Sequence, residues 1–407
     1  MNTKMKSLGA AIIILASASF ALTTFAAEGD THYTDDIRLT KTFIGPDPAL
    51  ATYPTNIKFT FEFTTPEFFL SNGTQQTGDY TKYEIPDQTL TFTTDQGTVT
   101  NGALTIHQQT ENLLKLVDWT GAPAGIYMYR VKETLDTVAL PADHKTNLTY
   151  DTQEYTLRVY VGRDGVGGGT VEEDVTGTVT DPTGDKVDPN PVDPTNPGGP
   201  GEVESPNGFN FKNIYTVDAG TDPTDPTDPV DPTDPTDPAD PDASWKVTKV
   251  VSGSLSAKTD EFKFTVTLND SDLIVDKAHE YQIVTKNTNS ANAKTIKVGE
   301  VVTLYLKGDE DAYIKNLPTG VNVSVVESEI GEYTPSLAQK YHGIAGAAGT
   351  TSASGILGEK ANIVDYTNKW DQTTPTGIIM NNLPYVLMIV VGLGGIAFYV
   401  INKRRHA

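Results

Sequence analysis

Two groups of three polar residues interrupt segments whose apolar side chains alternate as they do in β-strands. The residues, in chain order, are Lys41, Glu133 and Asn213, then Lys249, Glu327 and Asn368. Each continues the apolar face of its segment, because side chains two apart along a strand share a face. For any one of them, an alternation that merely stops at the strand end is an ordinary explanation. The same three types in the same order, twice, instead favour a shared chemical role.

Burial decides what that chemistry would be. An unpaired buried ion costs several kcal/mol, so burial lowers the pKa of a lysine and raises the pKa of a glutamate. A neutral amine beside a neutral acid can then attack the carbonyl carbon of a nearby asparagine amide. The acid would polarise the amide oxygen and pass its proton to the departing ammonia. The predicted product is a Lys-Asn isopeptide bond that the protein forms once, on itself.

The elements that must position these residues all resemble strands. Segments such as "NIKFTFEFTT" and "EYTLRVYV" in the first half, and "FKFTVTL" and "VNVSVVES" in the second, alternate between apolar and polar residues and are separated by turns. No long amphipathic helix precedes the C-terminal apolar segment. The sequence therefore predicts an all-β protein with two tandem immunoglobulin-like β-sandwiches, at residues 27–217 and 244–370.

Two proline-rich stretches flank the last expected strand of the first sandwich. Residues 221–242 contain seven Asp-Pro pairs spaced by three residues, within a linker predicted at 218–243. Proline at every third position favours polyproline II, which would make this stretch a stiff spacer of about 70 Å. A calcium-binding repeat is disfavoured, because aspartates about 9 Å apart cannot easily share one ion. Residues 181–206 are expected to form a disordered insertion in the first sandwich.

The two ends of the chain indicate export and membrane insertion. Residues 1–26 have the basic start, apolar run and small residues of a signal peptide. In the segment 371–407, about 19 nearly uncharged residues from Leu383 to Ile401 precede Lys403, Arg404 and Arg405. A buried core helix is the alternative, but a C-terminal run with a basic stop favours a membrane span whose tail stays in the cytoplasm.

Composition narrows the function classes. The chain has 407 residues, no cysteine and a net charge of −23. An acidic surface argues against nucleic acid or anionic lipid as a partner, so the only expected membrane contact is the C-terminal segment. The absence of cysteine suits an exported protein of a Gram-positive surface that is stabilised without disulfides. No catalytic motif or cluster of metal ligands is evident, so we expect no enzyme activity on other molecules, no cofactor and no metal.

The motifs resemble those of a known family. "LTKTF", "YRVKE", "YDTQEYTLRVYV" and "FNFKN" in the first half, and "KVTKVVSG", "VSVVES" and "VDYTNK" in the second, are similar to the two-domain major backbone pilins of Gram-positive bacteria, streptococcal type. The resemblance implies CnaB-like sandwiches and bonds from Lys41 to Asn213 and from Lys249 to Asn368. It also implies that Glu133 is the proton-relay acid of the first bond.

In the second sandwich, the resemblance gives Glu327 the same relay role. It further implies that a sortase acts on a sorting signal: Thr373, Thr374 and Pro375 precede Thr376 and Gly377, between which the enzyme would cut. Thr373 and Thr374, the first two positions of this signal, depart from the usual cell-wall motif Leu-Pro-x-Thr-Gly. The class of sortase that would read it therefore stays open. The implied partners are the sortase, neighbouring pilin subunits in a covalent homopolymer and cell-wall peptidoglycan, with a host surface left open.

A pilus backbone also needs a lysine that receives the next subunit. "GDKV" places Lys186 in a context similar to that of the pilin lysine, and it is the only lysine between Lys145 and Lys212. A solvated loop lysine is the alternative for this residue. A monomeric wall-anchored adhesin or stalk protein is the alternative for the whole chain, because it would keep the sorting signal and the isopeptide domains without needing Lys186.

Overall fold

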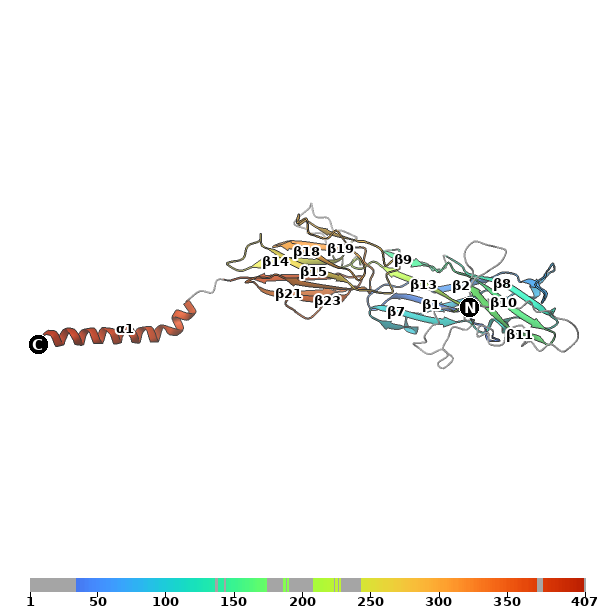
Figure 1. Cartoon of the computed structure of the whole chain (residues 1–407), viewed down its shortest axis with the longest axis horizontal. Coiled ribbons are helices and arrows are strands. Elements are labelled where there is room, and N and C mark those ends of the chain that lie inside the picture. The colour runs from blue at the N-terminus through green and yellow to red at the C-terminus, as the bar shows by residue number, and fades with distance from the viewer. Residues whose placement is uncertain are drawn as a thin grey trace, which may run out of the picture.

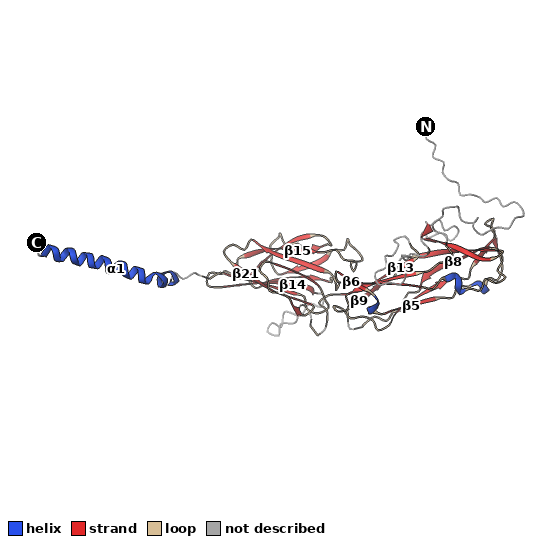
Figure 2. Ribbon diagram, turned by 90° about the horizontal axis from the view of Figure 1, so that it is seen from below, coloured by secondary structure: helices blue, strands red, loops and turns tan. Residues whose placement is uncertain are grey.

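A computed structural model of the chain describes residues 34–135, 138–142, 144–173, 186–187, 189, 208–222, 224–225, 227, 243–371 and 376–405. The predicted signal peptide therefore lies outside the described residues. The prediction of an all-β protein is confirmed: four sheets form two sandwiches, which lie end to end along the long axis (Figures 1 and 2).

The first sandwich packs a five-stranded sheet against an eight-stranded one. In spatial order the smaller sheet holds β6 (Thr98–Thr100), β7 (Ala103–Gln109), β1 (Thr40–Pro46), β13 (Asn210–Val217) and β9 (Thr146–Thr149). The larger holds β12 (Lys186–Val187), β11 (Gly165–Glu173), β10 (Glu154–Gly162), β8 (Gly125–Glu133), β2 (Ile57–Phe63) and β5 (Gln88–Phe92), with β3 (Glu67–Phe69) and β4 (Gln75–Gln76) beside them. Short 3₁₀ turns occupy Thr81–Tyr83, Thr94–Gln96 and Leu113–Leu116.

The second sandwich packs a seven-stranded sheet against a four-stranded one. The larger sheet holds β17 (Thr295–Ile296), β16 (Tyr281–Thr285), β19 (Glu310–Lys315), β14 (Ala243–Ser252), β24 (Ile363–Lys369), β21 (Thr334–Tyr341) and β22 (Ile344–Ala345). The smaller holds β18 (Val301–Lys307), β15 (Glu261–Leu268), β20 (Asn322–Ser328) and β23 (Ser352–Ile356).

Alternating side chains build the core of each sandwich. In β2 the residues Ile57, Phe59, Phe61 and Phe63 are buried and the intervening ones are not. Each sandwich has its own apolar cluster between its two sheets. Because the inner faces must interlock over their whole length, a polar residue that continues the alternation is carried into the same dry layer.

In both sandwiches the first and last strands lie side by side and run parallel. β1 pairs with β13, with Lys41 opposite Phe211 and Phe43 opposite Asn213. β14 pairs with β24, with Lys249 opposite Tyr366 and Val251 opposite Asn368. The lysine and the asparagine are thus offset by two residues on adjacent strands in each domain, which puts both side chains on the same face.

The two sandwiches contact each other directly. The chain leaving β13 forms a bridge between Asp218 and Pro318, and the Ala219 N–H donates to the Leu317 carbonyl at 2.8 Å. Gly102 of the first sandwich and Gly320 of the second, both with positive φ, approach so closely that a Cβ on either would lie 2.4 Å from the carbonyl oxygen of the other. Only glycine fits this approach.

A buried carboxylate links the same two bodies. Glu359, which is 3% exposed, accepts hydrogen bonds from the Thr52 N–H at 2.6 Å and the Thr52 hydroxyl at 2.8 Å. Its other oxygen lies 3.2 Å from the His144 ring nitrogen Nδ1, and its own N–H donates to the Leu50 carbonyl. One residue of the second sandwich is therefore hydrogen-bonded to the loop at residues 50–52 of the first and lies next to a second loop at His144.

This arrangement corrects the expected 70 Å spacer. A Cβ on Gly220, just before the Asp-Pro stretch, would lie 2.8 Å from the carbonyl oxygen of Ala243, just after it. The Thr227 N–H also donates to the Gly220 carbonyl, and the Asn362 N–H donates to the Thr227 hydroxyl. The stretch thus leaves and re-enters the fold at one place and does not separate the sandwiches. The proposed domain boundaries stay a prediction.

Among the residues that the structure describes, the one long helix is α1 (Thr376–Arg405), which contains Pro384. Its segment Pro384–Lys403 has a mean hydropathy of 2.2 and none of it is buried against the rest of the molecule. By length and composition it can cross a membrane, as the sequence predicted.

We expect Glu359→Ala to loosen the junction. The variant removes the charged acceptor of two Thr52 hydrogen bonds, and bonds to a charged group contribute about 1.5–3 kcal/mol each. Small-angle X-ray scattering should show a larger radius of gyration as the sandwiches reorient, with each sandwich still folded. Glu332→Ala, at an exposed position of the second sandwich, is the matched control. An unchanged scattering curve for Glu359→Ala would show that the other contacts suffice.

Candidate functional site: two buried Lys-Glu-Asn groups

The structure brings together all six residues singled out in the sequence, in two groups of three. Each lysine and asparagine come from adjacent parallel strands of one sheet, and the glutamate reaches them from the facing sheet. The lysine, asparagine and glutamate lie on β1, β13 and β8 in the first sandwich, and on β14, β24 and β20 in the second. All six side chains lie in the core layer, with exposures of 0% for both lysines and both asparagines, 6% for Glu133 and 2% for Glu327.

In the first group the glutamate bridges the other two residues with both of its oxygens. Lys41 Nζ donates to Glu133 Oε2 at 2.7 Å, and Asn213 Nδ2 donates to Glu133 Oε1 at 2.6 Å. The ammonium end of Lys41 also lies 4.7 Å from the centre of the Phe59 ring. The carboxyl group therefore stands between the amine and the amide nitrogen, where it can take a proton from one and give a proton to the other.

The oxygen of the Asn213 amide has a different partner. The backbone N–H of Asp151 donates to Asn213 Oδ1 at 2.7 Å. The sequence suggested that the glutamate would polarise this oxygen, whereas in the structure Glu133 faces the amide nitrogen. No pattern in the sequence marks Asp151, because a backbone donor leaves no residue-type signal; the residue occurs only within the family motif "YDTQEYTLRVYV".

The second group has the same residues in a less symmetric arrangement. Lys249 Nζ lies 2.6 Å from Glu327 Oε1, and Asn368 Nδ2 donates to that same oxygen at 2.9 Å. Within the fully described stretch 243–371, neither Glu327 Oε2 nor Asn368 Oδ1 has a hydrogen-bond partner. Lys249 Nζ lies 4.2 Å from the centre of the Phe262 ring. The two sites therefore differ in how their carboxyl and amide oxygens are held.

Desolvation controls the charge state of these groups. Burial raises the pKa of Glu133 against the opposing effects of Lys41 and Asn213, and the nearby Asp151 carboxylate adds to the rise. Burial also raises the pKa of Glu327, and it lowers the pKa of Lys249 to about 8. Both shifts favour a neutral amine beside a neutral acid, which is the state that nucleophilic attack on an amide needs.

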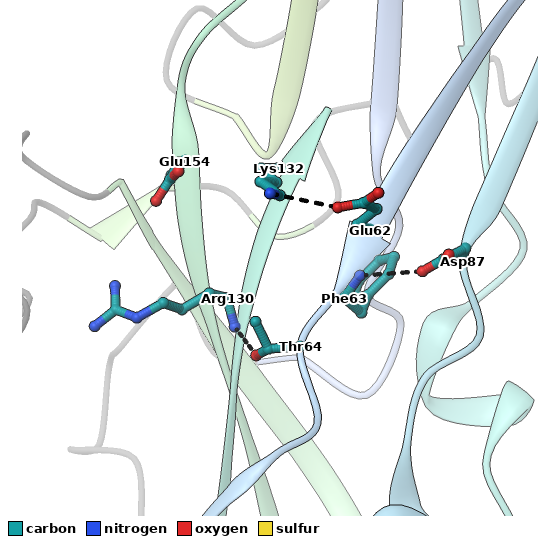
Figure 3. A pocket seen from close by; sticks show the side chains of 7 residues that line it. All are labelled: Glu62, Phe63, Thr64, Asp87, Arg130, Lys132 and Glu154. Atoms are coloured by element: carbon teal, nitrogen blue, oxygen red, sulfur yellow. Dashed lines mark hydrogen bonds and ion pairs between the residues drawn. The ribbon is translucent and has the colours of Figure 1, made fainter. Parts of the chain in front are cut away.

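Two open pockets lie along β8 near the first group and share Glu62, Lys132 and Glu154. One, with a volume of about 400 Å³, has Lys132 beside Glu62 at 3.4 Å, with Arg130, Asp87 and Glu154 around them (Figure 3). Its charges of both signs lie close together, so it has no clear preference for one class of charged ligand. The neighbouring pocket, of about 310 Å³, is lined in part by Glu133 and Asp151.

The structure also locates the remaining predicted residues in part. The backbone of Lys186 lies in β12 at the edge of the eight-stranded sheet, paired with Glu172 of β11, so it belongs to the folded body and not to a disordered insertion. Thr376 and Gly377 begin α1. Thr373, Thr374 and Pro375 lie outside the described residues.

Comparisons with known proteins point to pilins. A family model described as a domain of unknown function, DUF7601, matches residues 243–370. A pilin of Streptococcus pyogenes serotype M1 is 29% identical over 164 residues, which are 39% of this chain and 48% of that protein. The chain thus covers about half the length of this relative. This match confirms the similarity to streptococcal pilins that the sequence motifs indicated.

Solved structures that match include two from the same species. The major pilin from Streptococcus pyogenes is 18% identical, with 83% of this chain and 100% of that chain covered and a TM-score of 0.31. The major pilin T3.2 from Streptococcus pyogenes serotype GAS13637 is 19% identical, with 84% and 100% covered and a TM-score of 0.31.

The pKa shifts predict an unusual pH dependence when the second group is kept unreacted by Asn368→Ala. The folded state holds the Glu327 proton above the usual pKa of 4.5, so stability should fall as the pH rises from 4.5. The unfolded chain holds the Lys249 proton up to about its usual 10.5 while the folded state loses it near pH 8. Stability should therefore rise again from pH 8 to 10, by on the order of 2 to 3 kcal/mol.

Urea unfolding at a series of pH values, followed by tryptophan fluorescence of the second sandwich, measures this profile. Adding Lys249→Met to the Asn368→Ala variant should remove the rise above pH 8 and leave the fall above pH 4.5. A rise that persists without the lysine would mean that another group causes it.

Proposed function

We propose that this protein is the backbone subunit of a sortase-polymerised pilus, strengthened by two isopeptide bonds that it forms itself. The observation that carries the proposal is the buried Lys-Glu-Asn group, which occurs once in each sandwich between the first and last strands. The sequence similarity to a streptococcal pilin supports the same role. The protein would be a structural component of the surface of a Gram-positive bacterium and a substrate of a sortase, with no catalytic action on other molecules.

In the proposed reaction the neutral Lys41 amine attacks the side-chain carbonyl carbon of Asn213. The amine proton passes to Glu133 Oε2, and the proton on Oε1 passes to the amide nitrogen, which leaves as ammonia. Glu133 ends with one proton, as it began, so it acts as a true relay. Lys249, Glu327 and Asn368 undergo the same exchange in the second sandwich, where both transfers face a single glutamate oxygen.

Such bonds would carry tension along the molecule. β13 leads directly into the junction with the second sandwich, and a bond at Asn213 would attach this loaded strand to β1. In the second sandwich β14 receives the chain and β24 leads to the C-terminus. A bond from Lys249 to Asn368 would therefore join β14, where the chain enters the second sandwich, to β24, where it leaves. The strands between β14 and β24 in the sequence would not bear the load. By analogy with disulfides, each bond should stabilise its sandwich by about 4 to 5 kcal/mol.

Export, anchoring and polymerisation complete the proposal. The sortase would cut between Thr376 and Gly377 and join the threonine either to Lys186 of the next subunit or to peptidoglycan. A monomeric wall-anchored adhesin with the same isopeptide domains is the second candidate, and the edge position of β12 favours the polymer. Lys186 lies in a paired strand of the folded body, which gives an attachment point that can bear force.

The mass of the intact protein tests the crosslinks. Each bond expels one ammonia, so the chain should weigh about 34 Da less than its sequence requires, and Glu133→Ala or Glu327→Ala should each restore about 17 Da. Each variant should also unfold at a lower temperature in the affected sandwich only. Glu62→Ala, which removes a partly exposed carboxylate near the first group, should keep the full mass loss. An unmodified mass for the unsubstituted protein would refute the crosslink mechanism.

Polymerisation is tested by a denaturing gel of cell-wall extracts. We expect the unsubstituted protein to give a ladder of high-mass species and Lys186→Ala to give anchored monomer only, because the acceptor amine is gone. Lys145→Ala is the control for loss of a lysine as such. A persistent ladder in Lys186→Ala would assign the acceptor role to another lysine, and a single band for the unsubstituted protein would favour the monomeric adhesin.

A further inference from the structure

The geometry points to Asp151 as an unassigned catalytic group: its backbone N–H acts as the oxyanion donor for isopeptide formation at Asn213, and its carboxylate positions that N–H. This inference deepens the proposed function and rests on it. At the first site two residues would then act on the Asn213 amide: Asp151 on its oxygen and Glu133 on its nitrogen.

The contact with the reacting oxygen is short and comes from an obligate donor. The Asp151 N–H lies 2.7 Å from Asn213 Oδ1, while Asn213 Nδ2 donates to Glu133 at 2.6 Å. These two bonds fix which end of the amide is which, because a backbone N–H can only donate. A donor already aimed at the carbonyl oxygen stabilises the negative charge that develops there and needs no reorganisation during the reaction.

The Asp151 side chain holds its own backbone in place. One carboxylate oxygen accepts from the Lys212 N–H at 2.7 Å, and the other accepts from the Gln153 N–H at 2.9 Å. Lys212 immediately precedes Asn213 on β13, so the carboxylate ties the donor to the strand that carries the reacting amide. The segment 150–153 also crosses from β9, which pairs with β13, to β10, which pairs with β8. It therefore spans both sheets beside the site.

The second sandwich has no matching backbone donor among its described residues 243–371. Within residues 243–371, all of which are described, Asn368 Oδ1 is buried and has no hydrogen-bond partner. On the neighbouring strand β21, the residue in register with Asn368 is Pro335, which has no N–H to offer. The same glutamate chemistry is thus present in both sandwiches, but the oxyanion donor occurs only in the first. This makes the second bond an internal reference for any change at Asp151.

The reaction replaces one C–N bond of the Asn213 side chain with another. The Lys41 lone pair forms the new C–N bond while the C=O electron pair of Asn213 moves to Oδ1, where the negative charge meets the Asp151 N–H. The proton from the attacking nitrogen goes to Glu133 Oε2 and the proton on Oε1 goes to the amide nitrogen. When the carbonyl re-forms, the old C–N bond breaks and ammonia leaves. Glu133 and Asp151 both line the pocket of about 310 Å³, which gives the ammonia a route to solvent.

The test follows the rate of each bond separately in the full chain. Protein is collected at intervals after a pulse of isotope-labelled synthesis, and mass spectrometry quantifies the peptides crosslinked at Lys41–Asn213 and at Lys249–Asn368. Asp151→Pro removes the N–H and should slow the first bond on the order of 100- to 1,000-fold, as expected for loss of an oxyanion donor. Asp151→Ala keeps the N–H but frees the loop, and should slow the first bond less.

Asp151→Asn separates the effect of the position of the residue 151 N–H from the effect of the negative charge on the side chain. The amide oxygen can still accept from Lys212, so the rate near the optimum should recover toward that of the unsubstituted protein. The loss of the negative charge lowers the pKa of Glu133, which burial and Asp151 together raise. The pH at which the first bond slows as Glu133 loses its proton should therefore move down. A purely structural role of Asp151 would not move that pH.

The outcomes separate the two proposals. Slower formation of the first bond in Asp151→Pro and Asp151→Ala, at an unchanged rate of the second bond, supports the inference. A first bond that forms at the unsubstituted rate in both variants overturns it and leaves the crosslink proposal intact. No crosslinked peptide from either sandwich of the unsubstituted protein overturns the proposed function itself.

Discussion

Water is excluded from the layer between the two sheets of each sandwich, and the rest of the structure depends on that exclusion. Lysine and glutamate side chains in this layer have almost no solvent exposure, so their ionised forms lose most of their hydration. Two neutral partners, or a covalent bond between Lys41 and Asn213, relieve that cost. The same desolvation that makes the unreacted groups costly to bury would prepare the amine and the acid for the proposed reaction.

The strand order would give the proposed crosslinks a mechanical effect. The first and last strands of each sandwich are parallel neighbours, and each pair places a lysine and an asparagine two residues out of register. The proposed bond there would close nearly the whole sandwich into one loop. The direct junction at Glu359 and at the Gly102–Gly320 contact would then pass load from one closed loop to the next, which a flexible or extended spacer would not do.

The sequence predicted much of this from local patterns. Alternation along "GIYMYRVKE" was enough to direct Glu133 inward, and the repeated order of Lys, Glu and Asn was enough to suggest one site in each sandwich. The apolar C-terminal segment was likewise recognisable from its length. The expected spacer was wrong, because polyproline II geometry describes the 221–242 stretch alone and says nothing of how Gly220 and Ala243 meet on the second sandwich.

What the sequence by itself determined is therefore the all-β class, the inward direction of the six polar side chains and the apolar helix, since periodicity and composition are properties of a chain segment. Only the tertiary structure decided the orientation of the Asn213 amide, the unequal use of the glutamate oxygens and the contact between the sandwiches. These depend on a backbone N–H at Asp151 and on turns that approach across the fold. Every residue but proline has an N–H, so no residue type marks the one that will be aimed at a reacting oxygen.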